Sequence, residues 1–153
     1  MDRKQLILKL RETFDIRELV CEHVFNAFGE KAWQFFDQQA LESLLILRTQ
    51  VHKKAMTINT WKDGGPLTQR GLRCNICQIC KDKTIANELY MSAHANGAAF
   101  DYDVAGQTSE ESRQQVIQCA YMFTNRIRLE GKVTWVHFDV YDDPNSIQKV
   151  SIF

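Results

Sequence analysis

The spacing of apolar residues predicts helices in the first third of the chain. Asp15 and Glu18 stand three residues apart, as in a capping box that uses Asp in place of Ser or Thr. The apolar residues that follow recur at helical spacing: Ile16, Leu19, Val20 and Val24. Gly29 is expected to end or bend this segment. A second helix is expected after Asp37, with side chains on successive turns at Leu41, Leu44, Leu45 and Arg48.

From Met56 onward the apolar pattern changes to the two-residue period of β-strands. "MTINTW" alternates from Met56, and "KDGGPL" after it is a loop. "AAFDYDV" places Phe100, Tyr102 and Val104 on one face, opposite Ala99, Asp101 and Asp103. "VTWVHFDV" places Val136, Phe138 and Val140 on one face, opposite Trp135, His137 and Asp139. Each of these two strands therefore has an apolar face and a face that carries polar side chains.

A helix is expected between these two strands. Thr108 and Glu111 form a capping box, and the apolar residues after it predict a helix that runs to about Ile127. Residues 69–91 give weak signals and are expected to be mostly irregular. The interpretation is a single α+β domain over residues 1–153, mainly helical over 1–55 and a sheet with one long helix over 56–153. The N-terminal helices are expected to pack on a small, mainly antiparallel sheet.

Composition and charge exclude several classes of function. The chain has 153 residues, of which 44% are hydrophobic and 25% charged, as in an ordinary globular domain. Nineteen basic residues balance nineteen acidic ones, which argues against nucleic acid as a partner. No apolar run is long enough for membrane insertion, and the start lacks the features of a secretory signal. Synthesis in the cytoplasm and a monomeric state are the default expectations.

His94, Asp101 and His137 are the candidate metal ligands. Asp101 and His137 lie on the polar faces of the two predicted strands, so they share one cleft if those strands are neighbours. His94 stands seven residues before Asp101, with Gly97 between them to allow a tight turn and small side chains that leave room for a cation and substrate. Two imidazoles and one carboxylate are a ligand set of catalytic zinc. The alternative is that none of them binds metal: His94 would cap a turn, Asp101 would pair with a basic group, and His137 would be a hydrogen-bonded strand histidine.

The stretch "SAHANGAAFD" resembles the signature of the LAS-type zinc D,D-peptidases, whose fold is shared with the Hedgehog signalling domain. The pattern S-x-H-x-x-G-x-A-x-D is met from Ser92 to Asp101. The resemblance implies Zn²⁺ held by His94 and Asp101, and by His137 in "WVHFDV" as the third ligand. It also implies a Hedgehog/D,D-peptidase-like fold. "INTWKDGG" and the helical N-terminal region resemble phage-encoded members of the group.

The resemblance further implies an oxyanion-stabilising arginine and a proton-transfer group. "RGLRCNICQ" resembles the family's glycine-aromatic-arginine segment, with Arg73 as the matching residue and Arg70 as its competitor. Family members place a glutamate three residues, or a histidine two residues, before the last ligand, where this chain has Thr134 and Trp135. Asp139 is the best substitute, or else it supports a ligand imidazole through a hydrogen bond. Glu130 is a further, weaker candidate.

Three cysteines in "CNICQIC" form the most conspicuous motif of the chain. Cys74, Cys77 and Cys80 resemble part of an iron–sulfur run, but the position of the fourth cysteine is Thr84. Cys119 or Cys21 could complete a four-cysteine zinc site only through the fold. Without such a partner, free thiols in an irregular segment are the preferred interpretation. His23 and His52, in helical segments, are expected to be surface or interhelix residues.

The leading functional hypothesis is a zinc D,D-carboxypeptidase or an endopeptidase of the endolysin type. Its substrate would be a peptide bond in the stem or cross-link of bacterial peptidoglycan, reached after holin-type release or from a virion. A second hypothesis is a non-catalytic, metal-stabilised binding domain on the same Hedgehog-like scaffold, which would explain the missing base. A third is a cysteine–zinc interaction module built on "CNICQIC".

Overall fold

Three of the six α-helices begin at capping boxes, which fix their N-terminal boundaries locally. The computed structural model describes residues 1–153. Asp2 caps α1 (Arg3–Arg11), Asp15 caps α2 (Ile16–Leu19) and Thr108 caps α6 (Ser109–Gln118), each with a reciprocal bond from the third residue of the helix. Asp37 caps α4 (Gln38–Ile46). The capped helix starts at Asp15, Asp37 and Thr108 are therefore confirmed. The remaining α-helices are α3 (Glu22–Phe28) and α5 (Gln78–Ile85).

Five strands form one mixed sheet in the order β1-β2-β4-β3-β5. They are β1 (Met56–Thr57), β2 (Ala99–Val104), β3 (Ile127–Leu129), β4 (Val136–Asp139) and β5 (Val150–Ile152). Every neighbouring pair is antiparallel except β3 and β5. β2 and β4 are neighbours, as the shared cleft requires. The prediction of an α+β domain with a small, mainly antiparallel sheet is confirmed.

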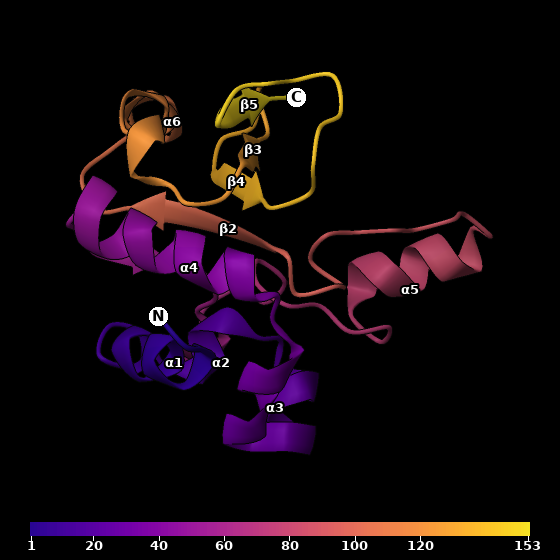
Figure 1. Cartoon of the computed structure of the whole chain (residues 1–153). Helices are drawn as coiled ribbons and strands as arrows, with labels where there is room; N and C mark the ends of the chain where they lie inside the picture. The colour runs from indigo at the N-terminus through magenta and orange to yellow at the C-terminus, as the bar shows by residue number, and fades with distance from the viewer.

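The apolar face of the sheet packs against the helical layer. In Figure 1, α4 runs along β2, with α1 to α3 on its far side and β3, β4 and β5 above. Phe100, Tyr102, Val136 and Phe138 are fully buried in the main core, and Phe36 stacks on Phe100 with ring centroids 5.3 Å apart. These are the residues that the alternating pattern assigned to the apolar face. The polar side chains of β2 and β4 are thereby held on the opposite face.

The sequence prediction was wrong for the length of the helix that starts after Thr108. It ends at Gln118, a short 3₁₀ turn covers Ala120–Met122, and Ile127 begins β3. Phe123 and Ile127 are buried all the same. Apolar residues four apart indicated a continuous helix, but a turn followed by a strand buries them equally well.

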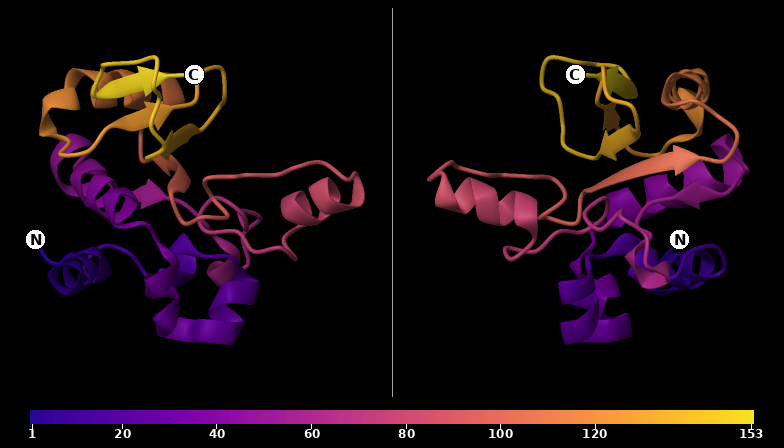
Figure 2. Two further views of the ribbon diagram at one scale, coloured as in Figure 1. Left: turned by 45° about the vertical axis from the view of Figure 1, so that its right-hand side comes forward. Right: turned by 180° about the vertical axis from the view of Figure 1, so that it is seen from behind.

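Residues 69–91 are mostly irregular, as expected, except that residues 78–85 form α5. This helix and the chain on either side of it, residues 74–91, project from the body of the molecule in every view (Figure 1 and Figure 2). We call residues 74–91 the arm. Cys80 is the only buried residue of α5. A helix that buries one residue has no apolar stripe, so periodicity could not reveal it.

Candidate metal centre

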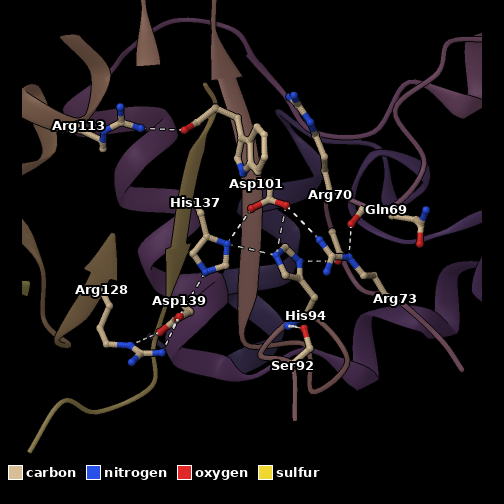
Figure 3. A network of polar contacts seen from close by, with 12 residues as sticks. Gln69, Arg70, Arg73, Ser92, His94, Asp101, Arg113, Arg128, His137 and Asp139 are labelled. Carbon is tan, nitrogen blue, oxygen red and sulfur yellow. Dashed lines mark hydrogen bonds and ion pairs between the residues drawn. The ribbon is translucent and has the colours of Figure 1, made fainter. Parts of the chain in front are cut away.

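Asp101 and His137 face each other across the antiparallel pair β2 and β4. They are direct partners in the strand register, so both side chains lie on the face opposite the core. His137 Nδ1 lies 2.7 Å from Asp101 Oδ1. His94 enters from the turn before β2, and its Nε2 lies 3.2 Å from His137 Nδ1 and 3.3 Å from Asp101 Oδ2 (Figure 3). All three residues are buried.

The geometry of this triad fits a metal ion. One donor atom from each residue lies within 4.8 Å of the others. Tetrahedral zinc with bonds of 2.0–2.2 Å holds its ligand atoms about 3.4 Å apart. The distances from His94 Nε2 to His137 Nδ1 and to Asp101 Oδ2, 3.2 and 3.3 Å, are close to this value. Each imidazole also has a second partner: His94 Nδ1 lies 2.9 Å from the Gly71 carbonyl, and His137 Nε2 lies 3.3 Å from Asp139. Partners of this kind orient an imidazole with its other nitrogen towards a metal.

Arg73 lies beside the ligands, whereas its competitor does not. Arg73 Nη2 donates to Asp101 Oδ2 at 3.2 Å, and Arg73 Nη1 donates to the Tyr90 hydroxyl at 2.9 Å. The Arg70 guanidinium instead forms an ion pair with Asp103 and does not line the pocket at the triad. Of these two arginines, Arg73 is therefore the one that lies at this centre.

The contacts of Asp139 favour the supporting role over proton transfer. Its two carboxylate oxygens accept both Nε and Nη2 of Arg128 at 2.9 Å. The same carboxylate accepts the Tyr141 backbone N–H at 3.0 Å and lies against His137 Nε2. The residue is only 2% exposed. Its acceptor positions are filled by protein groups, so it holds His137 in place.

Glu130 carries a second carboxylate near the triad, and unlike that of Asp139 it is not engaged by other protein groups. It follows β3 directly, and its backbone N–H donates to the His137 carbonyl at 3.3 Å, which continues the register of β3 with β4. Directly opposed residues of antiparallel strands point to the same face. Asp101, His137 and Glu130 thus form one row across β2, β4 and the end of β3. The Glu130 carboxylate has no hydrogen bond or ion pair.

These side chains line one pocket of about 370 Å³. Its walls include the triad, both supporting arginines and the two carboxylates just described; they are Arg73, Met91, Ser92, Ala93, His94, Asp101, Arg128, Glu130, Trp135, His137, Asp139, Tyr141 and Phe153. A second, more apolar pocket of about 660 Å³ lies between the arm and the helical layer and shares Arg73 with the first. The triad therefore lies on the wall of a pocket that adjoins a second pocket at Arg73.

Burial and charge oppose each other within the triad. Burial alone would raise the pKa of Asp101, but its hydrogen bonds with His137 and His94 outweigh burial and lower that pKa. Burial lowers the pKa of His94. Burial would do the same to His137, but Asp101 and Asp139 outweigh it and raise the pKa of His137 to about 9. The two carboxylates therefore favour a positive charge at His137.

The small residues of "SAHANGAAFD" serve close packing. Gly97 adopts a positive φ of 66°, and a Cβ built on it would lie 2.2 Å from the Phe35 carbonyl oxygen. Its own carbonyl accepts the Asp37 N–H, which ties this turn to the start of α4. Ala99 is fully buried and does not line the pocket. The expectation that small side chains leave room for cation and substrate was therefore wrong for Ala99, although Ala93 does line the pocket.

Replacing Gly97 with alanine is expected to destabilise the protein strongly. The positive φ costs an L-residue roughly 1–2 kcal/mol, and the overlap with the Phe35 carbonyl adds about 1–3 kcal/mol. Gly106 is the matched control, because its φ is 71° and a Cβ there meets nothing within 4 Å. Thermal or urea unfolding should show a larger loss for Gly97→Ala than for Gly106→Ala. Equal losses would contradict the packing argument.

A second group of metal-binding side chains lies on another part of the molecule. Cys21, His23, Cys74 and Cys77 each offer one ligand atom, and all four atoms lie within 4.8 Å of one another. The fold thus supplies the partner for "CNICQIC" that the sequence did not show. Cys74 and Cys77 are free thiols, as expected, and His23 is exposed. The fold nevertheless brings them together with Cys21, one of the two cysteines named as possible partners. Cys80 and Cys119 lie outside this group.

Comparison with protein-family models, with curated proteins and with solved structures finds no match to this chain. None of its helices is both long and apolar enough to span a membrane. The features that bear on function are therefore the two groups of potential metal ligands and the residues around them.

Proposed function

We propose that this protein is a zinc-dependent peptidase that hydrolyses a peptide bond in bacterial peptidoglycan, on a Hedgehog/D,D-peptidase-like fold. The observation that carries the proposal is the convergence of His94, Asp101 and His137 in one pocket with a free carboxylate and an arginine. The resemblance of "SAHANGAAFD" to the zinc D,D-peptidases supplies the reaction and the substrate class.

His94 Nε2, His137 Nδ1 and an oxygen of Asp101 would hold the metal. Bound there, zinc supplies Lewis-acid chemistry: it polarises a carbonyl and brings the pKa of a water molecule near neutrality. The Gly71 carbonyl and Asp139 keep the two imidazoles oriented for this task. Asp139 is in turn held by the two hydrogen bonds from Arg128.

Glu130 is the residue that we assign to proton transfer. Its place in the row with Asp101 and His137, its position on the pocket wall and its unpaired carboxylate support the assignment. It would accept a proton from the attacking water and deliver it to the leaving amine. Arg73 would donate hydrogen bonds to the oxyanion that forms on the substrate carbonyl.

Two guanidinium groups on the pocket wall support a substrate that carries a carboxylate. Arg73 and Arg128 both line it, and the Arg128 side chain is 24% exposed even though it pairs with Asp139. The stem peptide of peptidoglycan carries carboxylates, and a guanidinium binds such groups through paired hydrogen bonds. A peptide of this kind would place its scissile carbonyl between the metal ligands and Arg73.

The test is hydrolysis of purified peptidoglycan by the purified protein, combined with measurement of its metal content. Released stem-peptide fragments, detected by mass spectrometry, should disappear after removal of metal by a chelator and return when zinc is restored. Zinc bound at the triad without any release of fragments would contradict the enzyme proposal. That outcome would instead favour the metal-stabilised binding domain on the same scaffold.

A further inference from the structure

The four residues Cys21, His23, Cys74 and Cys77 come together through backbone pairing between distant segments. Leu72 donates its N–H to the Leu19 carbonyl at 2.8 Å and accepts the Cys21 N–H at 3.0 Å. This places Cys74 beside Cys21, and the Cys77 N–H then folds back onto the Cys74 carbonyl at 3.1 Å. His23 comes from the first turn of α3. The cluster is therefore built by the fold.

The distances within the cluster match a tetrahedral zinc site. Cys74 Sγ lies 3.7 Å from Cys77 Sγ, and His23 Nδ1 lies 3.5 Å from Cys74 Sγ and 3.8 Å from Cys77 Sγ. Zinc bonds of 2.3 Å to sulfur and 2.0–2.1 Å to nitrogen put sulfurs about 3.8 Å apart and sulfur and nitrogen about 3.6 Å apart. The Cys-x2-Cys spacing of Cys74 and Cys77 is also that of structural zinc sites.

We propose that Cys21, His23, Cys74 and Cys77 bind a second, structural zinc ion that fastens the arm to the helical layer. Four protein ligands leave no open position, which distinguishes this site from the three-ligand centre at His94. Cys21 and Cys77 are buried, whereas His23 is exposed, so the metal lies just under the surface. The site stands on its own geometry and does not depend on peptidase activity.

The arm needs such an anchor because it has almost no core of its own. Its large apolar side chains are largely solvent-exposed: Ile76, Ile79, Ile85, Leu89 and Met91. A segment that buries so little apolar surface cannot offset the entropy lost on ordering it. A metal that binds the folded arrangement contributes its binding free energy to that ordering. The anchor also bears on Arg73, the residue directly before Cys74.

Cobalt binding to the full-length His94→Ala variant tests the site, because that variant lacks a ligand of the other centre. One Co²⁺ per chain is expected, with the intense near-ultraviolet band of thiolate-to-cobalt charge transfer. Adding Cys77→Ser should weaken cobalt binding and reduce the band, because one of the three thiolates is lost, whereas adding Cys80→Ser should change neither, because Cys80 lies outside the cluster. Cobalt bound without the thiolate band, or a Cys74–Cys77 disulfide in protein purified under reducing conditions, would overturn the proposal.

Two further measurements keep the test decisive if Cys77→Ser does not fold. His23→Cys in the same background should retain one cobalt and strengthen the thiolate band, and failure to bind cobalt would count against the site. Trypsin cleavage after Lys81 and Lys83 in α5 should be slow with zinc bound and at least tenfold faster after its removal. Equal cleavage rates would show that the metal does not fasten the arm. Neither readout requires this protein to hydrolyse peptidoglycan, so the structural zinc site and the peptidase proposal can fail separately.

Discussion

Replacing His94 with alanine is expected to remove one zinc ion per chain and to reduce peptidoglycan hydrolysis to the uncatalysed background. His94 Nε2 is one of only three ligand atoms at the centre, and two remaining ligands bind zinc too weakly to keep it. Metal content by mass spectrometry and fragment release measure the two effects. The thiolate site should keep its zinc, so the metal content falls from two ions to one.

Asn96→Ala is the matched control for this variant. Asn96 lies in the same turn and is exposed, and its side chain bonds only the Tyr141 hydroxyl. It should retain both zinc ions and full activity. Asp101 keeps His137 and Arg73 as partners when His94 is removed, so the variant should fold with an unchanged circular dichroism spectrum. Hydrolysis that persists in His94→Ala would place the chemistry elsewhere in the molecule.

Replacing Glu130 with glutamine is expected to lower kcat by about 10²–10⁴-fold, the range for loss of a general acid–base group. Metal content and stability should not change, because the Glu130 carboxylate bonds no protein group in the fold. Glutamine keeps the size of the side chain and removes its ability to take a proton. Steady-state hydrolysis of a stem-peptide substrate at saturating zinc measures the effect.

Asp139→Asn separates this role from that of the neighbouring carboxylate. Asp139 supports His137, so its loss should weaken zinc binding about 10–100-fold. Activity in Asp139→Asn should therefore recover as zinc is added, whereas the lowered kcat of Glu130→Gln should persist at any zinc concentration. Recovery of Glu130→Gln with zinc, together with a lasting defect in Asp139→Asn, would reverse the two assignments.

The sequence by itself predicted the features that depend on local physics. Side chains of Asp15, Asp37 and Thr108 satisfy the first N–H groups of a helix wherever they stand, so these helix starts could be read from the chain. Strand alternation assigned Phe100 and Phe138 to the core and the polar side chains of β2 and β4 to the other face. The three candidate ligands could be named for the same reason, with the help of the resemblance.

Only the tertiary structure decided which distant residues meet. The register of β3 with β4 places Glu130 opposite His137 and Arg128 opposite Asp139. Neither pairing could be predicted from the two segments taken separately. Backbone bonds between Leu72 and the segment from Leu19 to Cys21 bring "CNICQIC" to His23. Because long-range pairing depends on the packing of the whole chain, the motif alone could not show that Cys21 and His23 lie beside it. The sequence named candidate ligands, and the fold determined how they are grouped.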